Sequence, residues 1–348
     1  FKPCESRFEG WILLRGVVFL GDRKVGLRDF PDPEPGPREA VVGVEASSIC
    51  GSDLRIYRRP EVNPNLIQGH EAAGVVVAVG DAVTSVKPGT RVSVYHHIGC
   101  GNCEYCRSGD WFYCRERWTW GLGIRHGSFS NLLLTDAAGC FQLPEELTYL
   151  DGSIISCAGG TAYAGLNKLH LEPDDVLAVY GLGPVGLSAL MIAKAIGVPV
   201  AAIELVEERL RLGERLGADL VVDAKSENPV EAIKAFTGGR GASAVAECSG
   251  STQGRVNALA SAAPLGRVAF IGMGTRNVMI DAELFPGYDL TLVGNHVFNV
   301  ALYDPFVRLM LNRGVHLEEM VTHRYSVEEA EEAFRLFDSG TCGKVAFV

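Results

Sequence analysis

Residues 176–204, VLAVYGLGPVGLSALMIAKAIGVPVAAIE, decide the fold of the second half of the chain. The segment over 174–180 predicts a buried strand, and the glycine-rich turn after it leads into an apolar helix over 184–197. A second strand is predicted over 199–204. The same alternation continues to about Asn299, which predicts βαβ units and therefore a parallel sheet with helices on its faces.

The turn in this unit has the pattern G-x-G-x-x-G, with Gly181, Gly183 and Gly186 at the glycine positions. Pro184 and Val185 lie between the second and the third glycine. Because the pattern follows a predicted strand and opens a predicted helix, it indicates a dinucleotide-binding site. The first glycine allows a tight turn, the second lets a pyrophosphate approach the backbone, and the third lets helix and strand pack closely. Free N–H groups at the helix N-terminus favour the phosphate.

Glu204 ends the next predicted strand, where an acid can hydrogen-bond the ribose hydroxyls of the nucleotide. We therefore expect NAD rather than NADP, because a 2′-phosphate would meet this carboxylate. Arg209 follows closely in the sequence and would weaken that preference. The alternative interpretation of Glu204 is an ordinary surface acid.

The first part of the chain has a different pattern. Short β-branched runs over 40–49, 72–80 and 91–98 are separated by Gly, Pro and Asp, which predicts a β-rich domain. An amphipathic helix over 326–340 and a last strand over 343–348 are expected to return to it. The expected division is an extension of unknown role over 1–14, a β-rich domain formed by 15–158 and 300–348, and a nucleotide-binding domain over 159–299.

Composition and charge limit the possible partners. The chain has 348 residues, of which 47% are hydrophobic, and a formal net charge of −10 with acids and bases scattered along it. This argues against nucleic acid or an anionic membrane surface as a partner. No apolar run is long enough to span a bilayer and the first residues do not have the pattern of a secretory signal, so we expect a cytoplasmic protein.

Four cysteines are crowded into the segment over 97–116. Their spacing is C-x2-C-x2-C-x7-C, and they are Cys100, Cys103, Cys106 and Cys114. Four thiolates in one turn-rich loop predict a closed tetrahedral zinc site. Such a site has no open position for a substrate, so this zinc should be structural. The alternative is a loop of unrelated cysteines.

A second group of candidate ligands is dispersed along the chain. Cys50 lies in CGSD, His70 in GHE and Cys157 in SCAGGT. Two thiolates and one imidazole with an open fourth position would form a catalytic zinc site. Sequence spacing does not show that the three residues meet, and each alone could be a buried thiol or a core histidine.

The segments ICGSDL over 49–54, GHEAAGVVVAVG over 69–80, the four-cysteine lobe and GLGPVG together resemble the zinc-dependent medium-chain alcohol dehydrogenase family. The resemblance extends from Arg15 to Val348 and is strongest to a bacterial branch with threonine- and polyol-dehydrogenase-like members. It implies an α/β protein with a GroES-like β-rich catalytic domain, a Rossmann domain with a doubly wound parallel sheet, and an active site in the cleft between them. It also implies a homo-oligomer, a tetramer or a dimer.

The resemblance further implies roles for single residues. Cys50, His70 and Cys157 match the catalytic zinc ligands, Glu71 matches an acid behind the metal that enters its coordination shell transiently, and Ser52 matches the hydroxyl that takes the substrate proton. The residues that fall in cofactor-lining segments are Thr161, Cys248, Ser249, Ile271 and Lys344. The expected cofactors are two zinc ions and one NAD per chain, and the expected partner is a small alcohol or carbonyl substrate.

Two positions depart from the family pattern. Many relatives have a histidine of the proton relay where this chain has Arg55, and arginine does not release its proton in proteins. The threonine and polyol branches usually have glutamate where Cys157 stands. We therefore expect hydride transfer between a primary or secondary alcohol and NAD, with threonine or polyol oxidation as alternatives and a non-catalytic NAD-binding protein as a weaker one.

Overall fold

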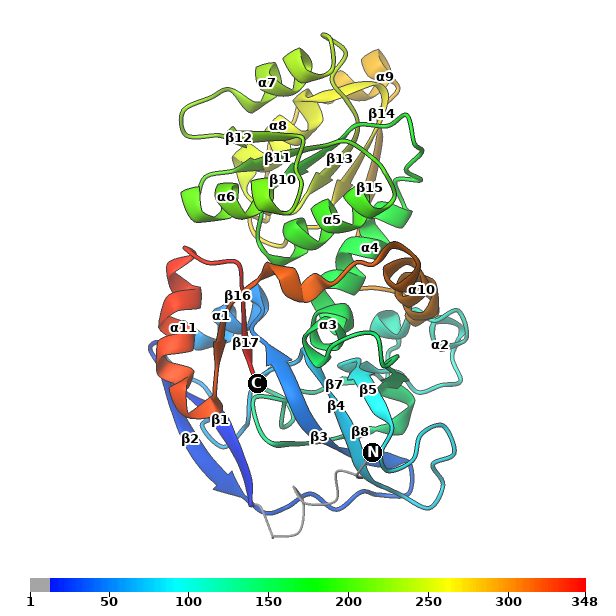
Figure 1. Ribbon diagram of the computed structural model, residues 1–348, viewed down its shortest axis with the longest axis vertical. Helices are drawn as coiled ribbons and strands as arrows, with labels where there is room; N and C mark the ends of the chain where they lie inside the picture. Colours follow the sequence, from blue (N-terminus) through cyan, green and yellow to red (C-terminus); the bar gives the residue numbers. More distant parts are fainter. Residues whose placement is uncertain (1–12) are drawn as a thin grey trace.

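The computed structural model of the protein describes residues 13–348, so nearly all of the predicted extension lies outside the described part (Figure 1). Two sheets lie one above the other along the long axis of the molecule, as Figure 1 shows. Each sheet has its own helices, and the chain returns to the first sheet at its C-terminus.

The upper sheet is entirely parallel, and its strand order is β12-β11-β10-β13-β14-β15. Its strands are β10 (Leu177–Tyr180), β11 (Val200–Glu204), β12 (Leu220–Asp223), β13 (Ala242–Glu247), β14 (Ala262–Phe270) and β15 (Thr291–Gly294). The order reverses between β10 and β13, and ligands of such sheets bind at this point, outside the carboxyl ends of the strands.

Helices on both faces of this sheet cover strands that are almost completely buried. They are α5 (Pro184–Ala195), α6 (Glu207–Arg215), α7 (Pro229–Phe236), α8 (Thr252–Ala260) and the short α9 (Leu284–Tyr288). Strands buried on both faces have continuous apolar runs rather than alternating ones, as in the sequence of β10 and β11. The alternation read from the sequence therefore corresponds to a doubly wound parallel sheet.

The lower sheet is mainly antiparallel. Its order is β16-β17-β3-β4-β5-β9, and β8 also pairs with β3. The strands are β3 (Glu39–Ser48), β4 (Ala72–Val79), β5 (Arg91–Val94), β8 (Leu132–Asp136), β9 (Cys140–Gln142), β16 (Val321–Tyr325) and β17 (Lys344–Phe347). The last strand of the chain thus pairs with β3, and the parallel pair β16–β17 extends the sheet beyond it.

Smaller elements surround this sheet. They are the hairpin of β1 (Leu14–Gly21) and β2 (Lys24–Phe30), the pair β6 (His97–Ile98) and β7 (Trp118–Thr119), the helices α1 (Gly51–Tyr57), α2 (Glu104–Arg107) and α10 (Tyr303–Arg313), and the 3₁₀ turns Trp111–Tyr113, Ala137–Gly139, Val300–Leu302, Leu317–Met320 and Val327–Glu329. The segment from β6 to β7 forms a lobe at the edge of the molecule, next to α10 (Figure 1).

Helix α11 (Ala330–Ser339) attaches the C-terminal segment to the β1–β2 hairpin. It buries Ala330, Ala333, Phe334 and Phe337, which the 3.6-residue period places on one face. The Phe334 ring lies 5.0 Å from that of Phe19, with the two planes nearly perpendicular. Burying one such ring contributes roughly 1.5–3 kcal/mol, so this face holds the segment in place.

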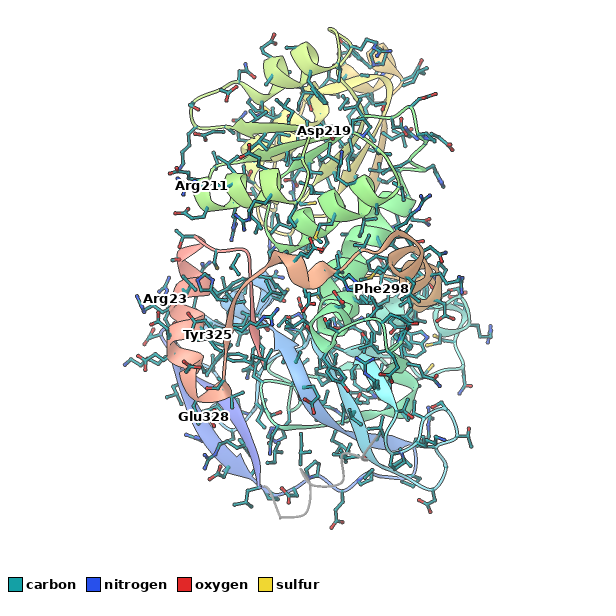
Figure 2. The ribbon with its side chains drawn as sticks, in the orientation of Figure 1. Arg23, Arg211, Asp219, Phe298, Tyr325 and Glu328 are labelled. Carbon is teal, nitrogen blue, oxygen red and sulfur yellow. The ribbon has the colours of Figure 1, made fainter. Side chains whose placement is uncertain are left out.

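The two sheets are joined by a continuous helical segment made of α3 (Tyr149–Ile154), a π-helical turn (Ile155–Gly159) and α4 (Gly160–Asn167). One apolar cluster includes residues of both parts, among them Tyr95 and Phe298, and the Tyr95 hydroxyl donates a hydrogen bond of 3.1 Å to the Phe298 carbonyl. Figure 2 shows Phe298 where the upper and lower parts meet. Among the described residues, no helix is long and apolar enough to cross a membrane.

Candidate metal and cofactor sites

Four predicted residues from three separate segments come together at the junction. Ligand atoms of Cys50, His70, Glu71 and Cys157 all lie within 4.8 Å of one another. Cys157 Sγ lies 3.6 Å from His70 Nε2. Zinc bonds of about 2.3 Å to sulfur and about 2.0–2.1 Å to nitrogen place two such ligands roughly 3.5 Å apart in a tetrahedron, so these atoms fit a zinc ion.

The local structure explains how two of these ligands are presented. Cys50 is the N-cap residue of α1, and Cys157 is the middle residue of the π-helical turn between α3 and α4. A π turn widens the helix by one residue, and such turns are frequent at functional sites. His70 and Glu71 directly precede β4. Secondary structure thus aims each donor at a common point, although no two of the three segments are neighbours in sequence.

Asp53 fixes the orientation of two of the ligands. Its Oδ1 lies 2.9 Å from His70 Nδ1, and its Oδ2 accepts a hydrogen bond of 2.8 Å from the Cys50 N–H. When Nδ1 of a histidine donates to a carboxylate, Nε2 is left free to bind a metal. Burial lowers the pKa of His70, but the charges and hydrogen bonds of Asp53 and Cys50 together outweigh it and hold this pKa well above its usual value.

Asp53 was not among the site residues inferred from the sequence. The signal was present in CGSD, because an acid three residues after the N-cap residue can complete a capping box. That local pattern predicts the hydrogen bond to the Cys50 backbone. It does not predict the contact with His70.

Glu71 and Lys344 form a fully buried ion pair behind the ligands. Lys344 Nζ lies 2.6 Å from Glu71 Oε2, and both side chains are 0% exposed. Burial raises the pKa of Glu71 to about 8, with the charge of Lys344 acting in the opposite direction. Lys344 was expected to line the cofactor, and the structure places its charged end against Glu71 in the metal site.

Ser52 lies beside the open side of the same group. Its Oγ is 3.2 Å from His70 Nε2, the atom that would face the metal. A hydroxyl in this place is within reach of an oxygen atom bound at the fourth coordination position. Arg55 is exposed one turn further along α1.

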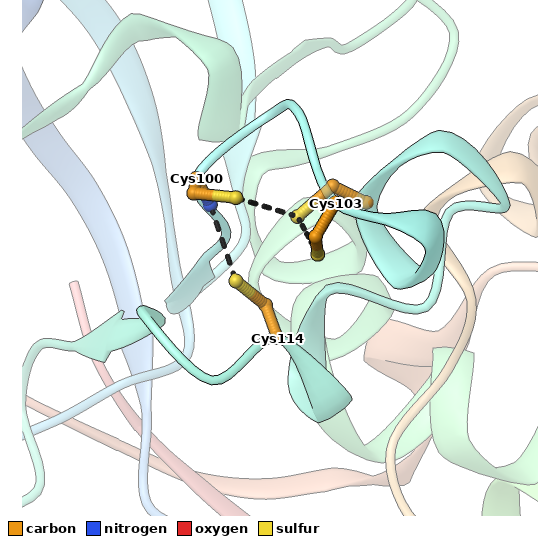
Figure 3. Close-up of side chains that lie close together, drawn as sticks. Cys100, Cys103 and Cys114 are labelled. Atoms are coloured by element: carbon orange, nitrogen blue, oxygen red, sulfur yellow. Dashed lines mark hydrogen bonds between the residues drawn. The ribbon is translucent and has the colours of Figure 1, made fainter.

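The four cysteines of the lobe also come together (Figure 3). Cys106 Sγ lies 3.5 Å from that of Cys103 and 3.9 Å from that of Cys100, and the Cys100 N–H points to Cys114 Sγ at 3.4 Å. A ZnS₄ tetrahedron with bonds of about 2.3 Å has sulfur atoms roughly 3.8 Å apart. The donor set therefore fits a closed zinc site. Hydrogen bonds from the backbone of Asn102 and Cys103 lower the pKa of Cys100 to about 7, which favours the thiolate.

A third group of possible ligands, Asp151, His316 and Glu318, has a different explanation. Asp151 caps α3 and accepts hydrogen bonds from the Thr148 N–H, the Glu318 N–H and His316 Nδ1, each 3.0 Å long. Its lone pairs are thus engaged in holding the segment of His316 against α3. We therefore interpret this group as a structural hydrogen-bond network and not as a metal site.

The glycine-rich turn has the geometry that its sequence predicts. Gly181 has φ = +87°, and a Cβ on it would lie 2.8 Å from the Ser249 backbone. A Cβ on Gly186 would lie 1.8 Å from the Gly181 carbonyl oxygen, whereas a Cβ on Gly183 would have no atom within 4 Å. Gly183 is the N-cap residue of α5 and Pro184 begins the helix. The open space at the helix N-terminus fits a pyrophosphate group.

The other predicted cofactor residues lie at the carboxyl ends of the parallel strands. Glu204 ends β11, and its carboxylate accepts hydrogen bonds from the N–H groups of Leu182 (2.7 Å) and Leu205 (2.6 Å). Arg209 lies 3.9 Å from the Glu204 carboxylate, so the two charges are neighbours. Cys248 and Ser249 directly follow β13, and Ile271 directly follows β14.

Thr161 lies in α4, below these strand ends. Its carbonyl accepts a hydrogen bond of 3.0 Å from Asn295 Nδ2, which also donates to the Val297 carbonyl at 3.0 Å. Val297 has φ = +51°, an unfavourable conformation for a β-branched residue. Strain of this kind persists where the surrounding contacts enforce it, and Asn295 supplies one of them.

Comparison with known proteins agrees with this arrangement. The family described as "Alcohol dehydrogenase GroES-like domain" matches residues 36–145, and the family "Zinc-binding dehydrogenase" matches residues 184–312. The uncharacterized zinc-type alcohol dehydrogenase-like protein YphC of Escherichia coli is 34% identical over 339 residues, which cover 93% of this chain and 96% of the relative. This chain belongs to the zinc-dependent medium-chain alcohol dehydrogenase family.

Other members of the family support the same conclusion. The L-threonine 3-dehydrogenase of Bacillus subtilis is 33% identical over 92% of this chain and 94% of its own length. The alcohol dehydrogenase TADH from Thermus sp. ATN1 has 31% sequence identity and a TM-score of 0.90, and the match covers 96% of this chain and 99% of that one. The family and the fold class predicted from the sequence are thereby confirmed.

A second group of residues near the ligands of this family member was not identified from the sequence. The group consists of two histidine rings and an arginine. His96 lies 4.7 Å from His70 between ring centroids, and His97 lies 4.0 Å from His96. The charged neighbours of these rings include Arg117. The only sign of these histidines in the sequence is the pair His96-His97 at the end of a predicted strand. Such a pair is too common to indicate a site.

Proposed function

We propose that this chain is an NAD-dependent dehydrogenase that transfers hydride between an alcohol and NAD at the site of Cys50, His70, Glu71 and Cys157. The observation that carries the proposal is the convergence of these four donor groups, with the Ser52 hydroxyl 3.2 Å from His70 Nε2. A binding module has no need of a hydroxyl beside an open coordination position. This argues against a non-catalytic NAD-binding protein.

The residues of the site have separate roles in the proposed reaction. A bound zinc ion would act as a Lewis acid on the substrate oxygen, and bound NAD would exchange the hydride. Cys50, His70 and Cys157 would hold the metal, and Asp53 keeps His70 in the required orientation. Ser52 accepts the substrate proton.

The route of this proton beyond Ser52 differs from that of relatives with a relay histidine. Arg55 occupies that position and keeps its own proton. We propose that the proton leaves through cofactor hydroxyls and water. The Glu71–Lys344 pair stays buried behind the ligands.

Glu204 and the glycine loop support the choice of NAD. The Glu204 carboxylate is held against the loop by the Leu182 N–H, so it is fixed beside the place expected for the adenosine ribose. We expect much higher kcat/KM with NAD+ than with NADP+, measured at saturating alcohol. Equal efficiency with the two cofactors would remove Glu204 from this role.

Primary and secondary alcohols are the substrates that we propose first, because the third ligand is Cys157. L-threonine or a polyol is the second candidate, favoured by the 33% identity with the L-threonine 3-dehydrogenase of Bacillus subtilis. We further propose a cytoplasmic homo-oligomer. The edge strand β15 leaves one side of the upper sheet unpaired among the described residues, which supports association at this edge.

The deciding experiment is an NAD+-reduction assay over simple alcohols, 2,3-butanediol, sorbitol, xylitol and L-threonine, with the zinc content measured on the same protein. Turnover by protein with two zinc ions supports the proposal. Cys140→Ala is a suitable control for changes at the ligands, because Cys140 is buried and belongs to neither ligand group. Absence of turnover with every alcohol, in protein that holds both metals, would favour the non-catalytic alternative.

A further inference from the structure

Three basic groups lie on segments that also carry or contact residues of the candidate active site, and we call them the basic rim. They are Arg55 in α1, Arg117 at the end of the zinc lobe and His296 after β15. Both arginines are exposed, and His296 is half-buried. None of the three belongs to either ligand group or to the glycine loop, so the proposed mechanism leaves them without a role.

Arg55 is placed by the helix that also carries Ser52. The two residues are three positions apart in α1, so their side chains lie on the same face of the helix. Ser52 Oγ is 3.2 Å from His70 Nε2, so this face looks toward the reacting oxygen. A long arginine side chain one turn away can therefore reach a substituent of the substrate that lies several bonds from the hydroxyl.

Arg117 and His296 are held by the ring of Phe112. Arg117 Cζ lies 4.3 Å from the Phe112 ring centroid, and the His296 ring lies 4.3 Å from the same ring. His97 contacts Phe112 at 4.9 Å on the side of the ligands. The ring contacts continue through His96 to the metal ligand His70, so Arg117 and His296 are connected to the metal site by one row of packed rings.

The charges of the rim are not neutralised by the protein. Within the described residues, neither Arg55 nor Arg117 has a carboxylate within 4.0 Å, whereas Arg58 on the same side of the molecule pairs with Asp338 at 2.6 Å. Arg117 donates one hydrogen bond to the Phe112 carbonyl, which leaves its other N–H groups without a protein acceptor among the described residues.

His296 complements the two arginines. Burial, followed by the positive charges of Arg55 and Arg117, lowers the pKa of His296. Its Nδ1 is buried without a hydrogen-bond partner among the described residues. A neutral imidazole of this kind can bind a hydroxyl group, and the unpaired atom would gain the partner that it lacks.

We propose that the substrate is an alcohol with an anionic group, a carboxylate or a phosphate, and that Arg55 and Arg117 bind this group. Guanidinium groups bind both anions through paired hydrogen bonds, and an arginine kept free of protein carboxylates is available for them. His296 binds a hydroxyl between the anion and the reacting carbon. The inference rests on the proposed dehydrogenase function and names the class of its substrate.

The test compares alcohols in pairs that differ by the anion. Suitable pairs are 2-butanol with 3-hydroxybutyrate, glycerol with glycerol 3-phosphate and sorbitol with sorbitol 6-phosphate. We expect the wild type to have the higher kcat/KM for the anionic member of at least one pair. Arg55→Ala should lower kcat/KM for that member about tenfold or more and leave the neutral member nearly unchanged, because one charge-assisted interaction is lost.

The controls separate a local effect from a change in net charge. Arg313→Ala removes an exposed arginine at the end of α10 and should leave both members of each pair unchanged. Arg55→Lys should recover part of the preference. Arg55 is exposed and makes no side-chain hydrogen bond among the described residues, so these variants should fold normally, which is checked by thermal unfolding. The preferred pair distinguishes a carboxylate from a phosphate.

A binding measurement separates this inference from the proposed function. Inorganic phosphate or acetate, compared with chloride at equal ionic strength, should raise the Tm of the wild type more than that of Arg55→Ala. Turnover of neutral alcohols with no preference for any anionic member overturns the inference and leaves the dehydrogenase function intact. If no alcohol is oxidised, the proposed dehydrogenase function is wrong. In that case the Tm measurement still tests the anion site, and equal Tm shifts in the wild type and in Arg55→Ala would overturn it.

Discussion

Replacement of Asp53 by asparagine tests whether this buried acid prepares the metal site. The carboxylate holds His70 Nδ1 at 2.9 Å through one oxygen and the Cys50 N–H at 2.8 Å through the other. Asparagine has the same shape but only one acceptor oxygen. Its NH₂ group must face either the Cys50 N–H, which leaves two donors opposed, or His70 Nδ1, which moves the ring proton to Nε2 and removes the lone pair for the metal.

The expected loss can be given a magnitude. Removing a carboxylate that orients a metal-bound histidine typically lowers metal affinity 10–100-fold, which corresponds to about 1.4–2.7 kcal/mol. The loss of a buried hydrogen bond to a charged group gives a similar value of about 1.5–3 kcal/mol. We therefore expect Asp53→Asn to bind one of its two zinc ions about 10–100-fold more weakly, with the other unchanged.

The chain provides a matched control for this variant. Asp151 is also fully buried, also completes a capping box and also contacts a histidine, His316, at 3.0 Å. Asp151→Asn should lower the free energy of unfolding without weakening zinc. Zinc affinity is measured by competition with a chromogenic chelator, and unfolding by urea titration. Unchanged zinc affinity in Asp53→Asn, or an equal loss in Asp151→Asn, would refute the reasoning.

Three further outcomes are expected. Cys157→Ala should hold one zinc ion fewer by metal analysis and lose turnover, and retention of both metals and of full activity would exclude this ligand. Gly186→Ala should lower the Tm, because its Cβ would lie 1.8 Å from the Gly181 carbonyl oxygen. Gly183→Ala should keep the Tm, because no atom of the chain lies within 4 Å of its Cβ, and should weaken NAD binding, because the Cβ would enter the space for the pyrophosphate. Equal Tm values for the two variants would contradict the assignment of the loop. The hydrogen bond to Asp151 raises the pKa of His316 above 6.5. The protonated His316 therefore stabilises the fold fully below pH 6.5, and this contribution is lost as the pH rises through the raised pKa. Urea titrations should show that His316→Ala lowers the free energy of unfolding more at pH 5.5 than at pH 9.

The parts of the protein that depend on neighbouring residues could be predicted from the sequence. The strand, turn and helix around Gly181 follow from a local change of hydrophobic period and from glycine spacing, and the structure has the predicted elements there. The lobe of Cys100 to Cys114 is equally local, because a short loop can bring closely spaced cysteines together without help from the rest of the fold. The resemblance to a known family then connected these segments to one function.

Only the tertiary structure decided which distant residues meet. His70 and Cys157 are 87 positions apart in sequence, and their contact depends on how the π-helical turn packs against the start of β4. The same holds for the Glu71–Lys344 pair, since β17 must first return to the lower sheet. Pairing across a fold results from the packing of whole elements, and a hydrophobic pattern specifies which face of an element is buried but not which side chain lies opposite. The sequence therefore determined the elements and the chemistry available, and the packing of the two sheets determined the site.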